Sequence, residues 1–94
     1  GDKIGNIYEA HISGIQSYGI YCEIDENHCE GMVKMSDLDN DYYDFDEKNY
    51  RLVGRRRHKV YQLGDPIRIQ VARADLGKRQ LDFILADDND NRKK

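Results

Sequence analysis

Two runs of opposite charge follow each other in the middle of the chain, and both contain residues that could do chemistry. The acidic run is Asp37, Asp39, Asp41, Asp44, Asp46 and Glu47, and the basic run is Arg51, Arg55, Arg56, Arg57, His58 and Lys59. Carboxylates could hold Mg²⁺ for phosphodiester hydrolysis, and dense cations could clamp phosphates. The spacing of the carboxylates defines no ligand set, however. We therefore predict neither a catalytic residue nor a metal site in this chain.

A second set of candidate ligands is formed by two cysteines and two histidines, Cys22, Cys29, His11 and His28. Their spacing matches no zinc finger or zinc ribbon, and two cysteines alone make no disulfide framework. Cys22 instead alternates with Ile20 and Ile24, which predicts a buried position on a strand. We expect it to be a core residue, and we expect this domain to need no cofactor.

The composition limits the kind of partner. The 94 residues suffice for one domain, and 15 Lys and Arg against 18 Asp and Glu give a net charge of −3. A protein that binds nucleic acid only through charge is normally basic, so binding here would need a local basic face with aromatic support. No segment has the length and apolarity of a membrane span or the pattern of a signal peptide. We expect a monomer in the cytoplasm, with no membrane partner.

Alternation of apolar and polar residues predicts five strands, over residues 3–15, 18–24, 31–35, 66–72 and 81–85. Gly19, between two tyrosines, is predicted to form a bulge that lets Tyr18 and Tyr21 share the outer face. Ser36 is predicted to cap a single helical turn after the third strand. Residues 39–61 form a long insertion with two short strands, around Tyr43 and residues 52–53. Residues 87–94 are predicted to be a disordered charged tail.

Five short strands with one helical turn between the third and fourth describe an all-β fold, the oligonucleotide-binding (OB) barrel. The long insertion falls in the same connection. An SH3-like barrel explains the alternation nearly as well, and pattern alone does not separate the two.

Three stretches resemble the S1-type RNA-binding domain family. They are Gly-Ile-Tyr-Cys-Glu-Ile at 19–24, Glu-Gly-Met-Val-Lys-Met-Ser-Asp-Leu at 30–38 and Leu-Gly-Asp at 63–65. The insertion, with Asp-Tyr-Tyr at 41–43 and Leu-Val-Gly at 52–54, is similar to the C-terminal domain of the ribonuclease R family of 3′-to-5′ exoribonucleases. The resemblance implies that residues 1–86 are one OB-fold domain, with 39–61 as a ribonuclease R-like insertion.

The resemblance also implies which residues bind RNA. Tyr18 and Tyr21 match two outward aromatic residues of the family, Asp75 and Arg79 match an acidic and basic pair beside the last hairpin, and Arg68 extends the basic edge. Lys34 stands where the family usually has histidine, which favours a phosphate contact over stacking. The implied partners are single-stranded RNA and the other domains of a parent nuclease, whose absent catalytic domain would need Mg²⁺.

Several alternatives remain open from the sequence. The run 55–59 could clamp phosphates or pair with the acidic run, and Tyr42 and Tyr43 are expected to pack the insertion rather than stack on bases. The predicted function is sequence-tolerant, non-catalytic binding of single-stranded RNA. The alternative is an OB barrel that binds protein and has little affinity for RNA.

Overall fold

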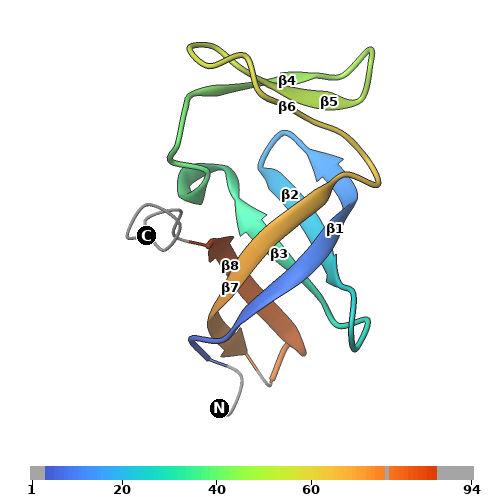
Figure 1. Ribbon diagram of the computed structural model, residues 1–94, viewed down its shortest axis with the longest axis vertical. Helices are drawn as coiled ribbons and strands as arrows, with labels where there is room; N and C mark the ends of the chain where they lie inside the picture. Colours follow the sequence, from blue (N-terminus) through green and yellow to red (C-terminus); the bar gives the residue numbers. More distant parts are fainter. Residues whose placement is uncertain (1–3, 76, 87–94) are drawn as a thin grey trace, which may run out of the picture.

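The structure is a computed structural model that describes residues 4–75 and 77–86. Within these residues, Figure 1 shows strands β1 (Ile7–Gln16), β2 (Gly19–Ile24), β3 (Glu30–Lys34), β4 (Tyr43–Asp46), β5 (Arg51–Gly54), β6 (Val60–Tyr61), β7 (Pro66–Asp75) and β8 (Gln80–Leu85), with a 3-10 turn, η1 (Met35–Asp37), after β3. The described part of the chain contains no helix long and apolar enough to span a membrane. The predicted tail at 87–94 lies outside the described residues.

Five of the strands close into a barrel in the order β1-β2-β3-β8-β7, and β7 pairs back onto β1. The β3–β8 pair is parallel, while the other pairs are antiparallel. A parallel pair needs a long connection between its strands. Here that connection contains η1, the insertion and β7 (Figure 1). The order of the strands confirms the predicted OB fold and removes the SH3-like alternative.

The core of the barrel is built by alternate residues of each strand, as the sequence pattern predicts. Its largest fully buried side chains include Phe83, Ile12, Ile15, Ile20, Ile24, Ile69, Val33 and Val71. Cys22 is fully buried among them. Burial raises the pKa of its thiol to about 12, so Cys22 stays neutral and packs as a small apolar residue.

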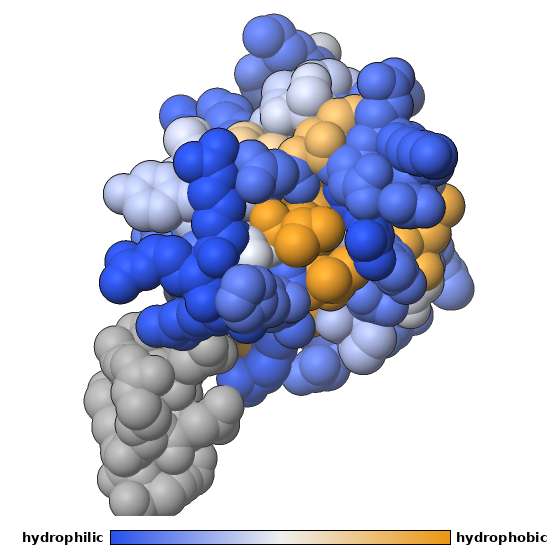
Figure 2. Space-filling view, turned by 90° about the horizontal axis from the view of Figure 1, so that it is seen from above, coloured by the Kyte–Doolittle hydropathy of each residue, from blue (hydrophilic) through white to orange (hydrophobic). Residues whose placement is uncertain are grey.

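The insertion folds as a separate three-stranded sheet, β4-β5-β6, at one end of the barrel (Figure 1). Leu52 and Tyr61 of this sheet are buried in the same hydrophobic cluster as the barrel residues. The insertion is therefore packed onto the barrel. From this end, the surface is mainly hydrophilic around a central apolar patch (Figure 2). The two predicted strands, around Tyr43 and residues 52–53, are confirmed as β4 and β5. The sequence did not predict β6, because it has only two residues and is too short to show alternation.

Two local predictions were wrong. The bulge lies in β1, between Ile12 and Gly14, and not at Gly19. Gly19 has a different role, since a Cβ there would lie 2.5 Å from the carbonyl oxygen of Val33, so glycine allows β2 and β3 to approach. Ser36 lies inside the helical turn, whose N-cap residue is Lys34, and no side chain caps it.

Candidate nucleic-acid interface

The two candidate tyrosines form one aromatic unit on the outside of the barrel. Their ring centroids are 6.4 Å apart in an edge-to-face arrangement, and their hydroxyl oxygens are hydrogen-bonded at 3.2 Å. Tyr18 lies in the turn before β2, where strand alternation does not apply, so it can share a face with Tyr21. The bond to the Tyr18 hydroxyl, followed by burial, raises the pKa of Tyr21. Tyr18 is 54% exposed, which leaves a ring available to stack on a base.

Tyr21 belongs to a row of outward residues that crosses the barrel. Cross-strand pairing gives this row as Gly14, Tyr21, Met32, Asp82 and Arg73, from β1 through β2, β3 and β8 to β7. The Tyr21 ring lies over Gly14, because a Cβ there would be 3.2 Å from its Cδ2. Arg73 forms an ion pair with Asp82 at 3.2 Å. Residue types alone did not single out Met32 or Asp82; the register of the strands places Met32 beside Tyr21 and Asp82 on the next strand of the same row.

Lys34 lies next to the tyrosine pair. It is exposed on β3, directly opposite Gly19, the residue between the two tyrosines. The backbone N–H of Met35, the next residue, donates to the carbonyl oxygen of Tyr18 at 2.8 Å. The ammonium group of Lys34 is therefore carried close to the aromatic unit, where a phosphate beside a stacked base could be met.

Asp75 and Arg79 lie at the β7–β8 hairpin, farther along the same outer face. The Asp75–Gln80 pair follows the Arg73–Asp82 and Ala74–Leu81 pairs along the two strands. Oδ1 of Asp75 accepts the backbone N–H of Lys78 at 3.1 Å, which gives the carboxylate a role in closing the hairpin. Arg79 has a left-handed backbone, with φ of +54°, and is exposed.

Arg68 lies away from the tyrosines, near the start of β7. It is opposite Glu9 on β1, and the two side chains form an ion pair at 3.0 Å. It lines a hollow of about 360 Å³ between the barrel and the insertion, together with Arg57 and Lys59. The structure therefore groups Tyr18, Tyr21 and Lys34 closely, and it separates Arg68 from them.

The acidic and basic runs of the insertion meet each other. Arg55 donates to both carboxylate oxygens of Asp44, at 2.8 to 3.1 Å, and Arg51 is 3.0 Å from Asp46. These pairs lower the pKa of Asp44 and contribute to lowering that of Asp46. They form because β4 and β5 are antiparallel, which places residues 44–46 beside residues 51–55. For these two arginines, the intramolecular alternative is what the structure contains.

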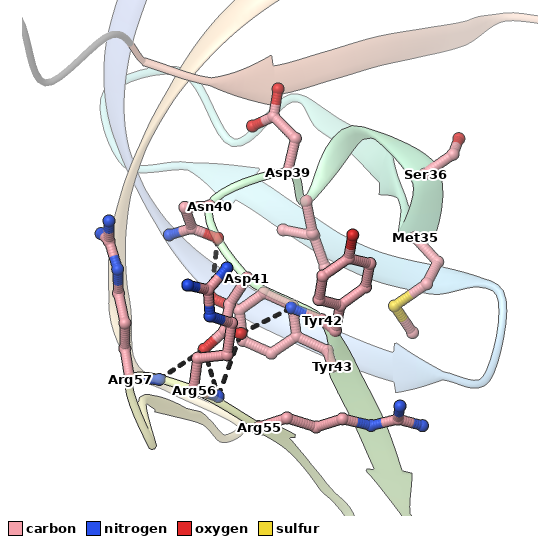
Figure 3. Close-up of a pocket in the computed structure, with 11 residues that line it drawn as sticks. Met35, Ser36, Asp39, Asn40, Asp41, Tyr42, Tyr43, Arg55, Arg56 and Arg57 are labelled. Atoms are coloured by element: carbon pink, nitrogen blue, oxygen red, sulfur yellow. Dashed lines mark hydrogen bonds between the residues drawn. The ribbon is translucent and has the colours of Figure 1, made fainter.

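Asp41 holds the loop after β5 through the backbone. Its carboxylate accepts the N–H groups of Arg56 at 3.1 Å and of Arg57 at 2.8 Å, and also that of its neighbour Tyr42 at 2.6 Å (Figure 3). The bond from Arg57 is the main cause of a lowered pKa for Asp41. Gly54 permits this approach, since a Cβ there would be 2.5 Å from Asp41 Oδ2. The arginine side chains of residues 55–57 diverge outward from the loop that Asp41 holds (Figure 3).

Replacing Asp41 with Asn should loosen this loop. The charged acceptor is lost, so we expect the amide protons of Arg56 and Arg57 to exchange faster with solvent. Hydrogen exchange followed by NMR measures this directly. The matched control is Asp44→Asn, which removes a side-chain ion pair and leaves both backbone bonds in place. Equal exchange rates in the wild type and Asp41→Asn would contradict the assignment. The pKa of Asp41 is lower in the folded protein than its ordinary value of 3.8, so its carboxylate contributes to the stability of the folded protein above about pH 3.8. This contribution is lost as the pH falls through the folded pKa.

The two tyrosines that were expected to pack the insertion, Tyr42 and Tyr43, lie in different environments. Tyr43 does pack: its ring is 5.3 Å from that of Tyr61, and its hydroxyl donates to Asn40 at 2.7 Å. Tyr42 does not, because it is 68% exposed. It lines an open hollow of about 860 Å³ between η1 and the arginine loop at 55–57. The prediction was confirmed for Tyr43 and wrong for Tyr42.

Within residues 4–75 and 77–86, no three His, Cys, Asp or Glu side chains gather closely enough to hold a metal ion. What the geometry offers is a barrel with paired aromatic rings and cations on its outside. Residues 2–85 match the S1 RNA-binding domain family, so the chain belongs to that family.

The curated relatives include ribonuclease R enzymes. That of Escherichia coli (strain K12) is 36% identical over 84 residues, which is 89% of this chain, and that of Thermotoga maritima is 37% identical over 87 residues, which is 93% of it. The chain spans 10% and 12% of their lengths, respectively. Ribonuclease R of Mycoplasma genitalium, solved in complex with ribose-methylated single-stranded RNA, has a TM-score of 0.83 at 30% identity, over 89% of this chain and 13% of the other.

Proposed function

We propose that this domain binds single-stranded RNA with little sequence preference, across the face that contains Tyr18, Tyr21 and Lys34, and has no catalytic centre of its own. The observation that carries the proposal is the hydrogen-bonded pair of rings beside an exposed lysine. Every base has a π-face, so stacking on such rings tolerates any sequence. The RNA in the complex of the Mycoplasma genitalium enzyme, a structural neighbour, supports single-stranded RNA as the ligand.

The charges around the rings indicate how the domain binds. Lys34, Arg73 and Arg79 are accompanied by Asp75, Asp82 and Glu30, whose carboxylate acts on Tyr21, so this part of the face has no excess positive charge. Stacking would then supply most of the affinity, and about two phosphate contacts would give a slope of log K against log salt near −1.4. Weak binding by the isolated domain follows from one short groove of this kind.

The parent protein is part of the same proposal. The similarity to ribonuclease R over the whole domain supports a larger cytoplasmic 3′-to-5′ exoribonuclease, in which this domain delivers RNA to a Mg²⁺-dependent catalytic domain. The other domains of that enzyme would be its protein partners.

An amide chemical-shift titration with a short single-stranded RNA, repeated at several salt concentrations, tests the proposal. We expect shifts at Tyr18, Tyr21, Lys34 and Arg79, similar for oligomers of different sequence, with affinity that falls as salt rises. Shifts confined to residues 51–59 would move the site to the basic run. An unchanged spectrum at millimolar RNA would favour a protein-binding barrel instead.

A further inference from the structure

The face that contains Tyr18, Tyr21 and Lys34, called the tyrosine face below, does not end at Tyr18. Met35, whose N–H is bonded to the carbonyl of Tyr18, also lines the hollow between η1 and the arginine loop at 55–57. This hollow has a volume of about 860 Å³ and is open to solvent (Figure 3). A strand that lies on Tyr18 and Lys34 can therefore enter the hollow without leaving the surface.

The lining of the hollow contains the chemistry that a nucleotide needs. The Tyr42 ring is the most exposed of the large apolar side chains in the described residues, at 68%. The side chains of Arg56 and Arg57 also line the hollow, are exposed and form no ion pair with any described residue. An aromatic ring and two exposed guanidinium groups in one hollow supply the groups that stack a base and contact phosphates.

Two other charged groups of the hollow already have hydrogen-bond partners. Arg55 is paired with Asp44, and the carboxylate of Asp41 already accepts three backbone N–H groups. Asp39 also lines the hollow, is exposed and would repel a phosphate. Apart from the Arg55–Asp44 pair, the hollow therefore contains two arginines and two aspartates, and what it offers to RNA is the exposed ring and guanidinium groups rather than a net positive charge.

We propose that the insertion forms a second RNA-contact site, in which a base of the strand bound at Tyr18 and Tyr21 stacks on Tyr42 and its flanking phosphates contact Arg56 and Arg57. This inference rests on the proposed function and extends the same strand over the insertion. The backbone bonds to Asp41 hold the arginine loop in place for it. The site lengthens the RNA footprint of the domain.

Two labelled oligouridylates test the inference by fluorescence anisotropy, one of about four nucleotides and one of about ten. Tyr42→Ala should weaken binding of the long oligomer about tenfold and leave the short one unchanged, whereas Tyr42→Phe, which keeps the ring, should bind both like the wild type. The double variant Arg56→Gln/Arg57→Gln should lower the magnitude of the salt slope for the long oligomer by about 1.4. Lys48→Gln, which removes one positive charge from the turn at the other end of β4 and β5, is the control for nonspecific charge effects and should change nothing.

A variant that gains affinity provides an independent check, because misfolding would lower the affinity for RNA and would not raise it. Asp39→Asn removes the repelling carboxylate, so it should tighten binding of the long oligomer a few-fold and leave the short one unchanged. If the Tyr42 and double-arginine variants bind the long oligomer as the wild type does, the second site is overturned and the tyrosine face stands. If both oligomers depend on the insertion and neither depends on Tyr18 and Tyr21, the proposed function of that face fails instead.

Discussion

Replacing both Tyr18 and Tyr21 with alanine should weaken binding of single-stranded RNA about thirtyfold or more. A base stacked on an aromatic ring contributes about 1–3 kcal/mol, and the double variant removes two platforms. We expect this to be the largest loss of RNA affinity from any change on this surface. The nearby charges have mixed signs, so electrostatic attraction replaces little of the lost stacking energy. Isothermal titration with a short single-stranded RNA at constant salt measures it.

The control for this experiment is Tyr18→Phe/Tyr21→Phe. It keeps both rings and removes only the 3.2 Å bond between the hydroxyl groups, so most of the affinity should remain. Because the Tyr21 ring also covers Gly14, the single variant Tyr18→Ala provides a second test at the more exposed position. Wild-type affinity in a folded double-alanine variant would overturn the proposed face.

The second large effect concerns the barrel itself: Phe83→Ala should lower the free energy of unfolding by about 3–5 kcal/mol. Phe83 is fully buried on β8, and its ring fills the space beside Gly31, where a Cβ would be 2.6 Å from Cζ of Phe83. It thereby joins β8 to β3, the parallel pair of the barrel. Small domains have only about 5–15 kcal/mol of stability, so this loss is a large part of the whole.

Urea unfolding followed by circular dichroism measures that change. Tyr42→Ala is the matched control, since it also truncates an aromatic ring but at a largely exposed position, and it should change stability by less than about 0.5 kcal/mol. A loss for Phe83→Ala as small as that of the control would show that the ring does not support the β3–β8 pair.

The sequence predicted much of the barrel because its information is local. Alternation of period two identified the inward residues of the strands, such as Ile20, Cys22 and Ile24, and their burial confirms it. Pro66 at the start of β7 and the turn before it were also correct. In contrast, the bulge was wrongly placed at Gly19, because an irregularity in β1 leaves no mark in the pattern of β2.

The insertion is the part of the chain whose contacts local sequence patterns did not predict. Its two charge runs were visible in the sequence, but whether they meet each other or a ligand depends on the register of β4 and β5, which places Asp44 beside Arg55 and Asp41 beneath the loop at 56–57. Adjacent Tyr42 and Tyr43 look equivalent in the sequence. Only the packing of Tyr43 against Tyr61 leaves Tyr42 at the surface.

The sequence by itself determined the all-β barrel, its core and the membership of the S1 RNA-binding domain family, because strand alternation and family motifs are contained in short segments. The tertiary structure decided which of those residues share a face. It placed Met32 beside Tyr21 and Asp82 on the next strand of the same row, and it placed Arg68 away from that ring. Met35 connects the tyrosine face to the hollow at Tyr42. The physical reason is that strand pairing brings together residues far apart in the chain, and no local pattern records the register of that pairing.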